Sequence, residues 1–82
     1  IHRAASGGHA AVVRLLLEKG GEVSSKDDHG ETPLHIAAGF GHKAVASLLL
    51  EHGAHESARS NAGWTPLHSA AADGHDSVAR LL

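Results

Sequence analysis

The sequence predicts an all-α fold in which short pairs of helices stack side by side, and three observations support this prediction. The chain repeats itself every 33 residues, so that residues 32–37 (TPLHIA) match residues 65–70 (TPLHSA). Prolines and glycines recur at places in each period where helices are expected to begin and end. With 82 residues and no cysteine, the chain has little room for a globular core and no disulfide to support one. A stacked repeat architecture is therefore favoured.

The first helix of the central period is predicted to begin at Pro33. Thr32 before it is a suitable N-cap, and proline fits the first helical position because the N–H that it lacks has no partner there. Helical spacing gives this helix an apolar face of Leu34, Ala37 and Ala38. Gly41 suits the left-handed residue that ends such a helix.

The second helix is predicted from about Lys43 to His52, with Gly53 as its stop. Its expected buried stripe consists of Val45, Leu48 and Leu49. One period earlier, the same stripe is expected to consist of Val12, Leu15 and Leu16, followed by Gly20. Between the periods, turn-forming residues at 25–30 and 59–63 predict projecting, hairpin-like turns.

The pattern Gly-x-Thr-Pro-Leu-His-x-Ala-Ala…Gly-His…Leu-Leu…Gly resembles the ankyrin repeat, and the resemblance covers the whole chain. It implies an all-α ankyrin-repeat solenoid of stacked helix-turn-helix units with projecting turns, and a non-catalytic function in protein–protein interaction. In this frame the chain holds a partial repeat (1–26), a complete repeat (27–59) and a second partial repeat (60–82). Because about three stacked units are needed for stability, we expect these residues to be part of a longer array.

Glu56 and Ser60 are among the positions that depart from the pattern of the family. Glu56 stands one period after Val23, in a column that the family usually fills with an apolar residue, so looser packing is expected there. Ser60 occupies the place of Asp27, and a weaker turn is therefore expected before Trp64.

Histidine is abundant, with nine in the chain, and the repeat accounts for six of them. These six fall into two columns, which are His2, His35 and His68, and His9, His42 and His75. The resemblance implies that they form hydrogen bonds within and between repeats rather than perform chemistry. The remaining three are His29, His52 and His55.

We expect neither a metal site nor catalysis. A zinc site at His52 and His55 would need three or four convergent ligands, and Gly53 ends the helix between the two histidines. A hydrolase site would have to use Ser69, His68, Asp73 and His75, but these are sequence neighbours without a nucleophile elbow and do not define a catalytic triad. The Gly-x-Gly motif at 39–44 follows a predicted helix instead of the strand that a dinucleotide site requires. No cofactor and no small-molecule substrate are expected.

Charge and hydropathy exclude two further classes of partner. Seven basic and nine acidic residues give a net charge of −2, and the basic residues are scattered along the chain, which is not a nucleic-acid footprint. No apolar run approaches the roughly 20 residues of a membrane span. The resemblance implies an intracellular location, in the cytoplasm or the nucleus.

The residues expected to contact a partner lie where the repeat does not dictate the side chain. By resemblance, the turn tips and the exposed ends of the first helices line a concave recognition surface. The candidates are Lys26, Asp28, His29, Glu31, Phe40, Arg59, Asn61, Trp64 and Asp73. They include the only two aromatic residues of the chain, and their alternating charges predict a protein or peptide partner of mixed charge.

Two other roles stay open from the sequence. The segment could be a structural spacer within a longer array, or a designed scaffold, whose contacts lie elsewhere. It could also be a regulatory ankyrin segment attached to an enzyme or a channel.

Overall fold

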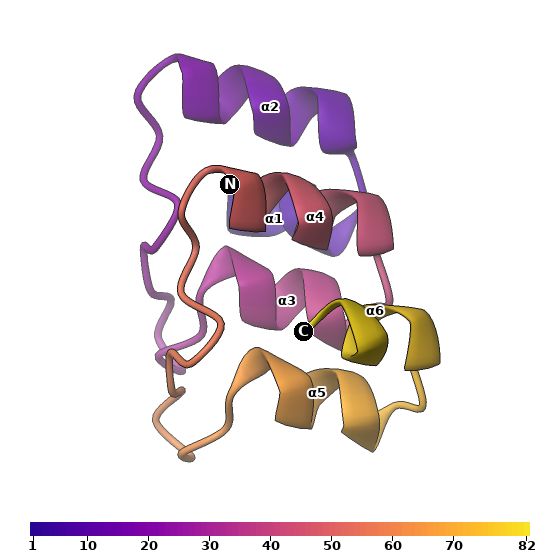
Figure 1. The fold of residues 1–82 in the computed structure, drawn as a ribbon. Coiled ribbons are helices and arrows are strands. Elements are labelled where there is room, and N and C mark those ends of the chain that lie inside the picture. Colours follow the sequence, from indigo (N-terminus) through magenta and orange to yellow (C-terminus); the bar gives the residue numbers. More distant parts are fainter.

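The computed structural model describes all 82 residues and contains six helices and no strand. The helices are α1 (His2–Ser6), α2 (Ala10–Glu18), α3 (Pro33–Gly39), α4 (Lys43–Glu51), α5 (Pro66–Ala72) and α6 (Asp76–Leu81). Helices α1, α3 and α5 stack in one layer, and α2, α4 and α6 stack in a second layer that packs against the first (Figure 1). The predicted all-α fold of stacked helix pairs is confirmed.

Helix α3 begins where the sequence predicts. The hydroxyl oxygen of Thr32 accepts a hydrogen bond from the backbone N–H of His35 at 3.4 Å. In return, the N–H of Thr32 donates to Nδ1 of His35 at 3.1 Å. Thr65 and His68 form the same reciprocal pair at the start of α5. Each pair satisfies backbone N–H groups that an uncapped helix would leave without a partner.

The ends of the helices also agree with the prediction, within one residue. Helix α3 is followed by Phe40 and then by Gly41, whose φ of +75° is the left-handed conformation expected there. Helix α4 ends at Glu51, one residue before the predicted end. The ring Nδ1 of His52 then donates to the carbonyl oxygen of Leu48 at 3.0 Å, which also accepts the backbone N–H of His52.

The core lies between the two layers of helices. The predicted stripe of α4 is buried, as are the small and apolar residues on the facing side of α3; the set comprises Leu34, Ala37, Ala38, Val45, Leu48 and Leu49. The small side chains of Ala37 and Ala38 allow the two layers to approach closely.

The stripe predicted for α2 is wrong at two of its three positions. The side chains of Val12 and Leu15 are 47% and 52% exposed, Leu16 is half-buried, and the buried residue of the helix is Val13. In the second layer, α4 packs between α2 and α6, whereas α2 packs against α4 on one side only. The two helices therefore share the repeat pattern, but the exposed row of α2 lacks a second-layer helix that would bury it.

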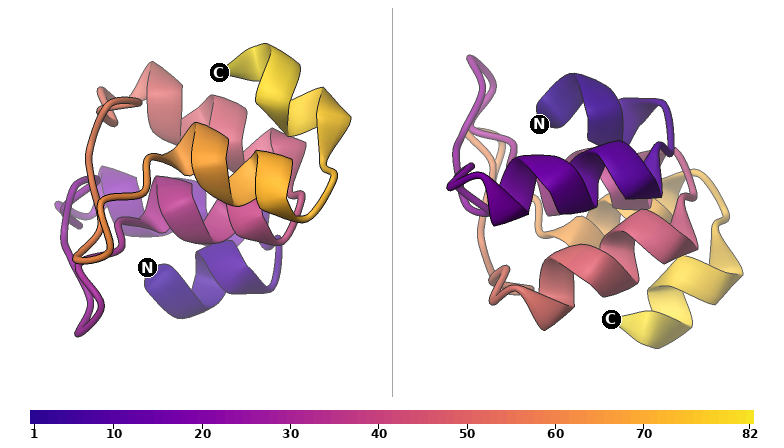
Figure 2. Two further views of the ribbon diagram at one scale, coloured as in Figure 1. Left: turned by 90° about the horizontal axis from the view of Figure 1, so that it is seen from below. Right: turned by 90° about the horizontal axis from the view of Figure 1, so that it is seen from above.

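The turns between repeats project from the same side of both layers (Figure 2). Each is closed by a backbone hydrogen bond, from Asp27 N–H to Glu31 O at 3.0 Å and from Ser60 N–H to Trp64 O at 2.8 Å. A further bond from Asn61 N–H to the carbonyl oxygen of His29, at 2.9 Å, joins one turn to the next. The turns are thus hairpin-like, as predicted.

The two departures from the repeat pattern have visible consequences. The carboxylate oxygen Oδ1 of Asp27 accepts N–H groups from His29 and Glu31, both at 2.9 Å. The hydroxyl of Ser60, one period later, accepts only the N–H of Trp64, at 3.2 Å. Ser60 therefore makes one side-chain hydrogen bond fewer than Asp27, although the second turn is still closed. Glu56 is exposed, whereas Val23 is half-buried and packs against the core.

Candidate functional site: a groove across two repeats

One column of histidines fixes the bases of the turns. The ring Nε2 of His2 donates to the carbonyl oxygen of Glu31 at 2.8 Å, and Nε2 of His35 donates to that of Trp64 at 2.7 Å. Because Nδ1 of His35 accepts a backbone N–H, the ring proton lies on Nε2, as the second bond requires. Each of these histidines therefore holds in place the first residue after the next turn.

The second column of histidines fixes the opposite ends of the first helices. Nε2 of His42 donates to the carbonyl oxygen of Ser6 at 2.9 Å, and Nε2 of His75 donates to that of Gly39 at 3.1 Å. The role expected for the repeat histidines, hydrogen bonding within and between repeats, is confirmed for both columns. His9 is the exception, since its side chain has no hydrogen-bond partner within these residues.

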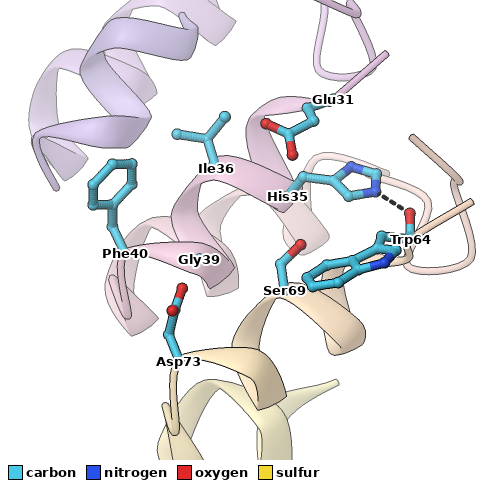
Figure 3. Close-up of a pocket in the computed structure, with 8 residues that line it drawn as sticks. All are labelled: Glu31, His35, Ile36, Gly39, Phe40, Trp64, Ser69 and Asp73. Carbon is cyan, nitrogen blue, oxygen red and sulfur yellow. Dashed lines mark hydrogen bonds between the residues drawn. The ribbon is translucent and has the colours of Figure 1, made fainter. Parts of the chain in front are cut away.

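Three of the positions held by histidines, Glu31, Gly39 and Trp64, line a groove of about 230 Å³ between α3 and α5 (Figure 3). Four of the predicted partner contacts line it, namely Glu31, Phe40, Trp64 and Asp73. The other lining residues are His35, Ile36, Gly39 and Ser69. The structure thus brings together residues from two repeats that are up to 42 positions apart in the sequence.

The groove has two ends of similar chemistry. Glu31 and Trp64 occupy the same position in successive repeats, directly before the two Thr-Pro pairs, and lie at one end (Figure 3). Phe40 and Asp73 also share one repeat position, directly after α3 and α5, and lie at the other end. At a rise of 1.5 Å per residue, the seven residues of α3 separate the two ends by about 10 Å. Each end therefore combines one aromatic ring with one carboxylate.

Both aromatic rings are exposed to an unusual degree for side chains of their size. Phe40 is 59% and Trp64 is 44% exposed. Each ring is near a histidine of its own repeat: Phe40 stacks on His42 at a centroid distance of 6.2 Å and an interplanar angle of 14°, and Trp64 lies 6.2 Å from His68 at 35°. His42, which bonds to Ser6 of the preceding repeat, thus lies beside Phe40, and His68, which caps α5, lies beside Trp64.

The groove is acidic. Glu31 and Asp73 contribute carboxylates, no lysine or arginine lines the groove, and both nitrogens of the His35 ring already have hydrogen-bond partners. The nearby turn carries a further carboxylate. Partial burial opposes ionisation of Asp27, but the hydrogen bonds from the N–H groups of Glu31 and His29 outweigh it, and the net effect lowers the pKa of Asp27.

The remaining five predicted contacts lie on the turns, outside the groove. They are Lys26, Asp28, His29, Arg59 and Asn61, and all are exposed. Two of them also support the turns. Nδ2 of Asn61 donates to the carbonyl oxygen of Asp28 at 3.2 Å, and a guanidinium nitrogen of Arg59 donates to the carbonyl oxygen of Gly63 at 3.1 Å.

Sequence reasoning missed the floor of the groove. Ile36 and Ser69 share one repeat position, four residues before Phe40 and Asp73 respectively. Residues four apart on a helix lie on the same face, so this spacing could have identified both from the predicted contacts. Ser69 is nonetheless buried, and its place beneath the groove depends on how α5 packs on α3.

No three histidine, aspartate or glutamate side chains come close enough to share a metal ion. No helix is both long and apolar enough to cross a membrane.

Comparison with known proteins identifies the class of this chain. A family model described as ankyrin repeats, in three copies, matches residues 1–82. The chain belongs to the ankyrin repeat family, as its sequence pattern and stacked helix pairs indicate, and ankyrin repeats are generally protein–protein interaction modules.

Two curated relatives show the same resemblance over part of the chain. The ankyrin repeat-containing protein P1E11.10 of Schizosaccharomyces pombe is 44% identical over 36 residues, which is 44% of this chain and 17% of that protein. A putative ankyrin repeat protein of Rickettsia bellii is 47% identical over 35 residues, which is 43% of this chain and 15% of that protein. The match thus spans less than a fifth of either relative.

Proposed function

We propose that this chain is a non-catalytic module that binds another protein, of mixed charge, through one face. This recognition face consists of the groove and the turn tips; its predicted contacts are Lys26, Asp28, His29, Glu31, Phe40, Arg59, Asn61, Trp64 and Asp73. The observation that carries the proposal is that both aromatic side chains of the chain are exposed in a single groove. Large aromatic residues at the centre of an interface are the usual carriers of binding energy.

The mechanism is rigid display. The repeat histidines fix the backbone at both ends of the groove before any partner arrives, through the bonds of His35 to Trp64 and of His75 to Gly39. Little conformational entropy is therefore lost when a partner binds, which favours affinity. The exposed charges of Lys26, Asp28 and Arg59 would act mainly on specificity and on the rate of association.

The proposal is tested by affinity capture with the chain and with a Phe40→Ala/Trp64→Ala variant. Circular dichroism first establishes that the variant is folded, and a protein captured by the parent chain is then purified and its affinity measured. We expect the variant to lose at least about 30-fold in affinity, because truncation of even one ring at an interface centre typically costs about 2 kcal/mol or more. A Val12→Ala/Leu15→Ala variant, which removes equally exposed apolar groups from another face, should bind like the parent chain.

The alternative role as a structural spacer predicts the opposite result. The exposed apolar row of Val12 and Leu15 on α2 favours this second role, because a row of this kind suits stacking on a further helix pair. Under it, the Phe40→Ala/Trp64→Ala variant would capture the same proteins as the parent chain, and the Val12→Ala/Leu15→Ala variant would not.

A further inference from the structure

We propose that the groove binds a positively charged segment of the partner, with lysine or arginine side chains placed against Phe40 and Trp64 and paired with Asp73 and Glu31. This inference rests on the proposed function, since it names the chemistry of the partner at the centre of the recognition face. It does not follow from the net charge of the chain, which is only −2.

The first argument is charge complementarity. Glu31 and Asp73 are the only charged residues that line the groove. The ring nitrogens of His35, which also lines it, are already hydrogen-bonded to Thr32 and to Trp64. An acidic segment would meet two carboxylates without a compensating cation, and its charge would be repelled. A neutral segment would leave both carboxylates partly desolvated and unpaired, which is unfavourable. A cationic segment satisfies both.

The second argument is the pairing of each carboxylate with a ring. Lysine ammonium and arginine guanidinium groups are attracted to the faces of aromatic rings, most strongly to tryptophan. Glu31 shares one end of the groove with Trp64, and Asp73 shares the other end with Phe40 (Figure 3). A long basic side chain can place its apolar stem along the ring and its charged head at the carboxylate. Each end therefore offers both interactions that such a side chain can make.

The third argument is preorganisation. The backbone of Glu31 is held by His2 and by Asp27, and that of Trp64 is held by His35 and by Ser60. The ends of the groove are about 10 Å apart along α3, as described above, which an extended chain spans with about three residues at 3.3 Å each. The groove thus suits an extended segment that presents two basic side chains to two fixed positions.

The test is selection from a random linear peptide library on the immobilised 82-residue chain, with the folded Phe40→Ala/Trp64→Ala variant as counter-selection. Binding of the selected peptides is then measured by fluorescence anisotropy. It is also followed through the emission of Trp64, which is the only tryptophan of the chain. Two charge variants are compared, each losing two negative charges. Glu31→Gln/Asp73→Asn neutralises the groove, and Glu18→Gln/Glu51→Gln neutralises two exposed carboxylates at the ends of α2 and α4.

We expect the selected peptides to be rich in lysine and arginine. The Glu31→Gln/Asp73→Asn variant should then bind them about three- to tenfold more weakly at low salt, as for two partly exposed ion pairs. The Glu18→Gln/Glu51→Gln variant should bind as the parent chain does, and raising the salt concentration should reduce the difference between the two variants.

Three results would overturn the inference. Selection of neutral or acidic peptides whose binding requires Phe40 and Trp64 would refute the cationic ligand and leave the proposed function intact. Basic peptides that bind all charge variants equally would show nonspecific attraction and refute the site. If no selected peptide depended on Phe40 and Trp64, the proposed function itself would fail along with the inference.

Discussion

At the scale of single residues, the histidines of this chain act as connectors between repeats. Their ring nitrogens donate to carbonyl groups at the ends of helices and turns, and each of these bonds joins one repeat to the next. The structure also contains an internal control, because His9 occupies the same repeat position as His42 but lacks a partner.

We therefore expect His42→Ala to destabilise the chain by about 1 kcal/mol more than His9→Ala, since only His42 donates a hydrogen bond, to Ser6. Urea unfolding followed by circular dichroism measures both changes. Equal losses of stability in the two variants would mean that the bond to Ser6 contributes nothing net.

Replacing Ser60 by aspartate should stabilise the second turn by about 0.5–1 kcal/mol at pH 7. A carboxylate there could accept the N–H groups of both Ala62 and Trp64, as Asp27 accepts those of His29 and Glu31 in the first turn. In the first turn these bonds lower the pKa of Asp27 against the opposing effect of burial.

The gain from Ser60→Asp should depend on pH in a definite direction. A carboxylate whose pKa is lowered by folding adds stability above its unfolded value of about 3.9 and loses that stability as the pH falls through its folded value. Melting temperatures of parent and variant should thus differ at pH 7 and converge below about pH 4. A difference that persisted at pH 3 would argue against hydrogen bonding to the ionised form.

At the scale of elements, two glycines that are two residues apart have opposite roles at the end of α3. Gly39 is helical, and a Cβ added there would lie 3.9 Å from Cβ of Ser69, an ordinary contact. Gly41 has a φ of +75°, and a Cβ added there would lie 2.5 Å from Nδ1 of His75.

Gly39→Ala should consequently stabilise the chain by about 0.5–1 kcal/mol, because alanine loses less backbone entropy than glycine in a helix. Gly41→Ala should destabilise it by about 2 kcal/mol, through the left-handed backbone and the displacement of His75. Thermal melts should separate the two variants by roughly 10 °C or more in this size range. Similar melting temperatures would contradict the assignment of Gly41 as the residue that ends the helix.

At the scale of the whole molecule, burial depends on the position of a repeat in the stack. Val12 and Val45 occupy the same repeat position, yet Val12 is 47% exposed and Val45 is fully buried. Val45→Ala should cost about 2 kcal/mol and Val12→Ala well under 1 kcal/mol. Chemical denaturation of the two variants measures this ratio. Equal costs would indicate that chains associate through α2 under the conditions of the experiment, so the sample should also be checked for oligomers by sedimentation.

The same comparison explains how far the sequence could predict the structure. Local chemistry and the repeat period predict helix starts at Pro33 and Pro66, a left-handed Gly41 and a buried Leu49. The structure confirms these predictions. The exposure of Val12 and Leu15 could not be predicted, because whether these side chains are buried depends on a neighbouring helix and not on their own repeat.

The candidate site was predictable only in part, for a similar reason. Phe40 and Trp64 stand out because they occupy positions that the repeat leaves free. That these two rings meet Glu31 and Asp73 in one groove, while Lys26 and Arg59 lie outside it, results from the packing of α5 on α3. No pattern within a single repeat contains this information.

Because the groove lies across the joint between two repeats, its width depends on the curvature of the array. Residues on its two sides, such as Phe40 and Asp73, belong to units that can rotate slightly relative to each other, and small rotations per repeat set the curvature of a repeat protein. A ligand that fits one width favours one curvature, and by thermodynamic reciprocity a force that bends the array changes the affinity of the groove by the same coupling free energy. The fraction of chains with an occupied groove would therefore change when the array is bent.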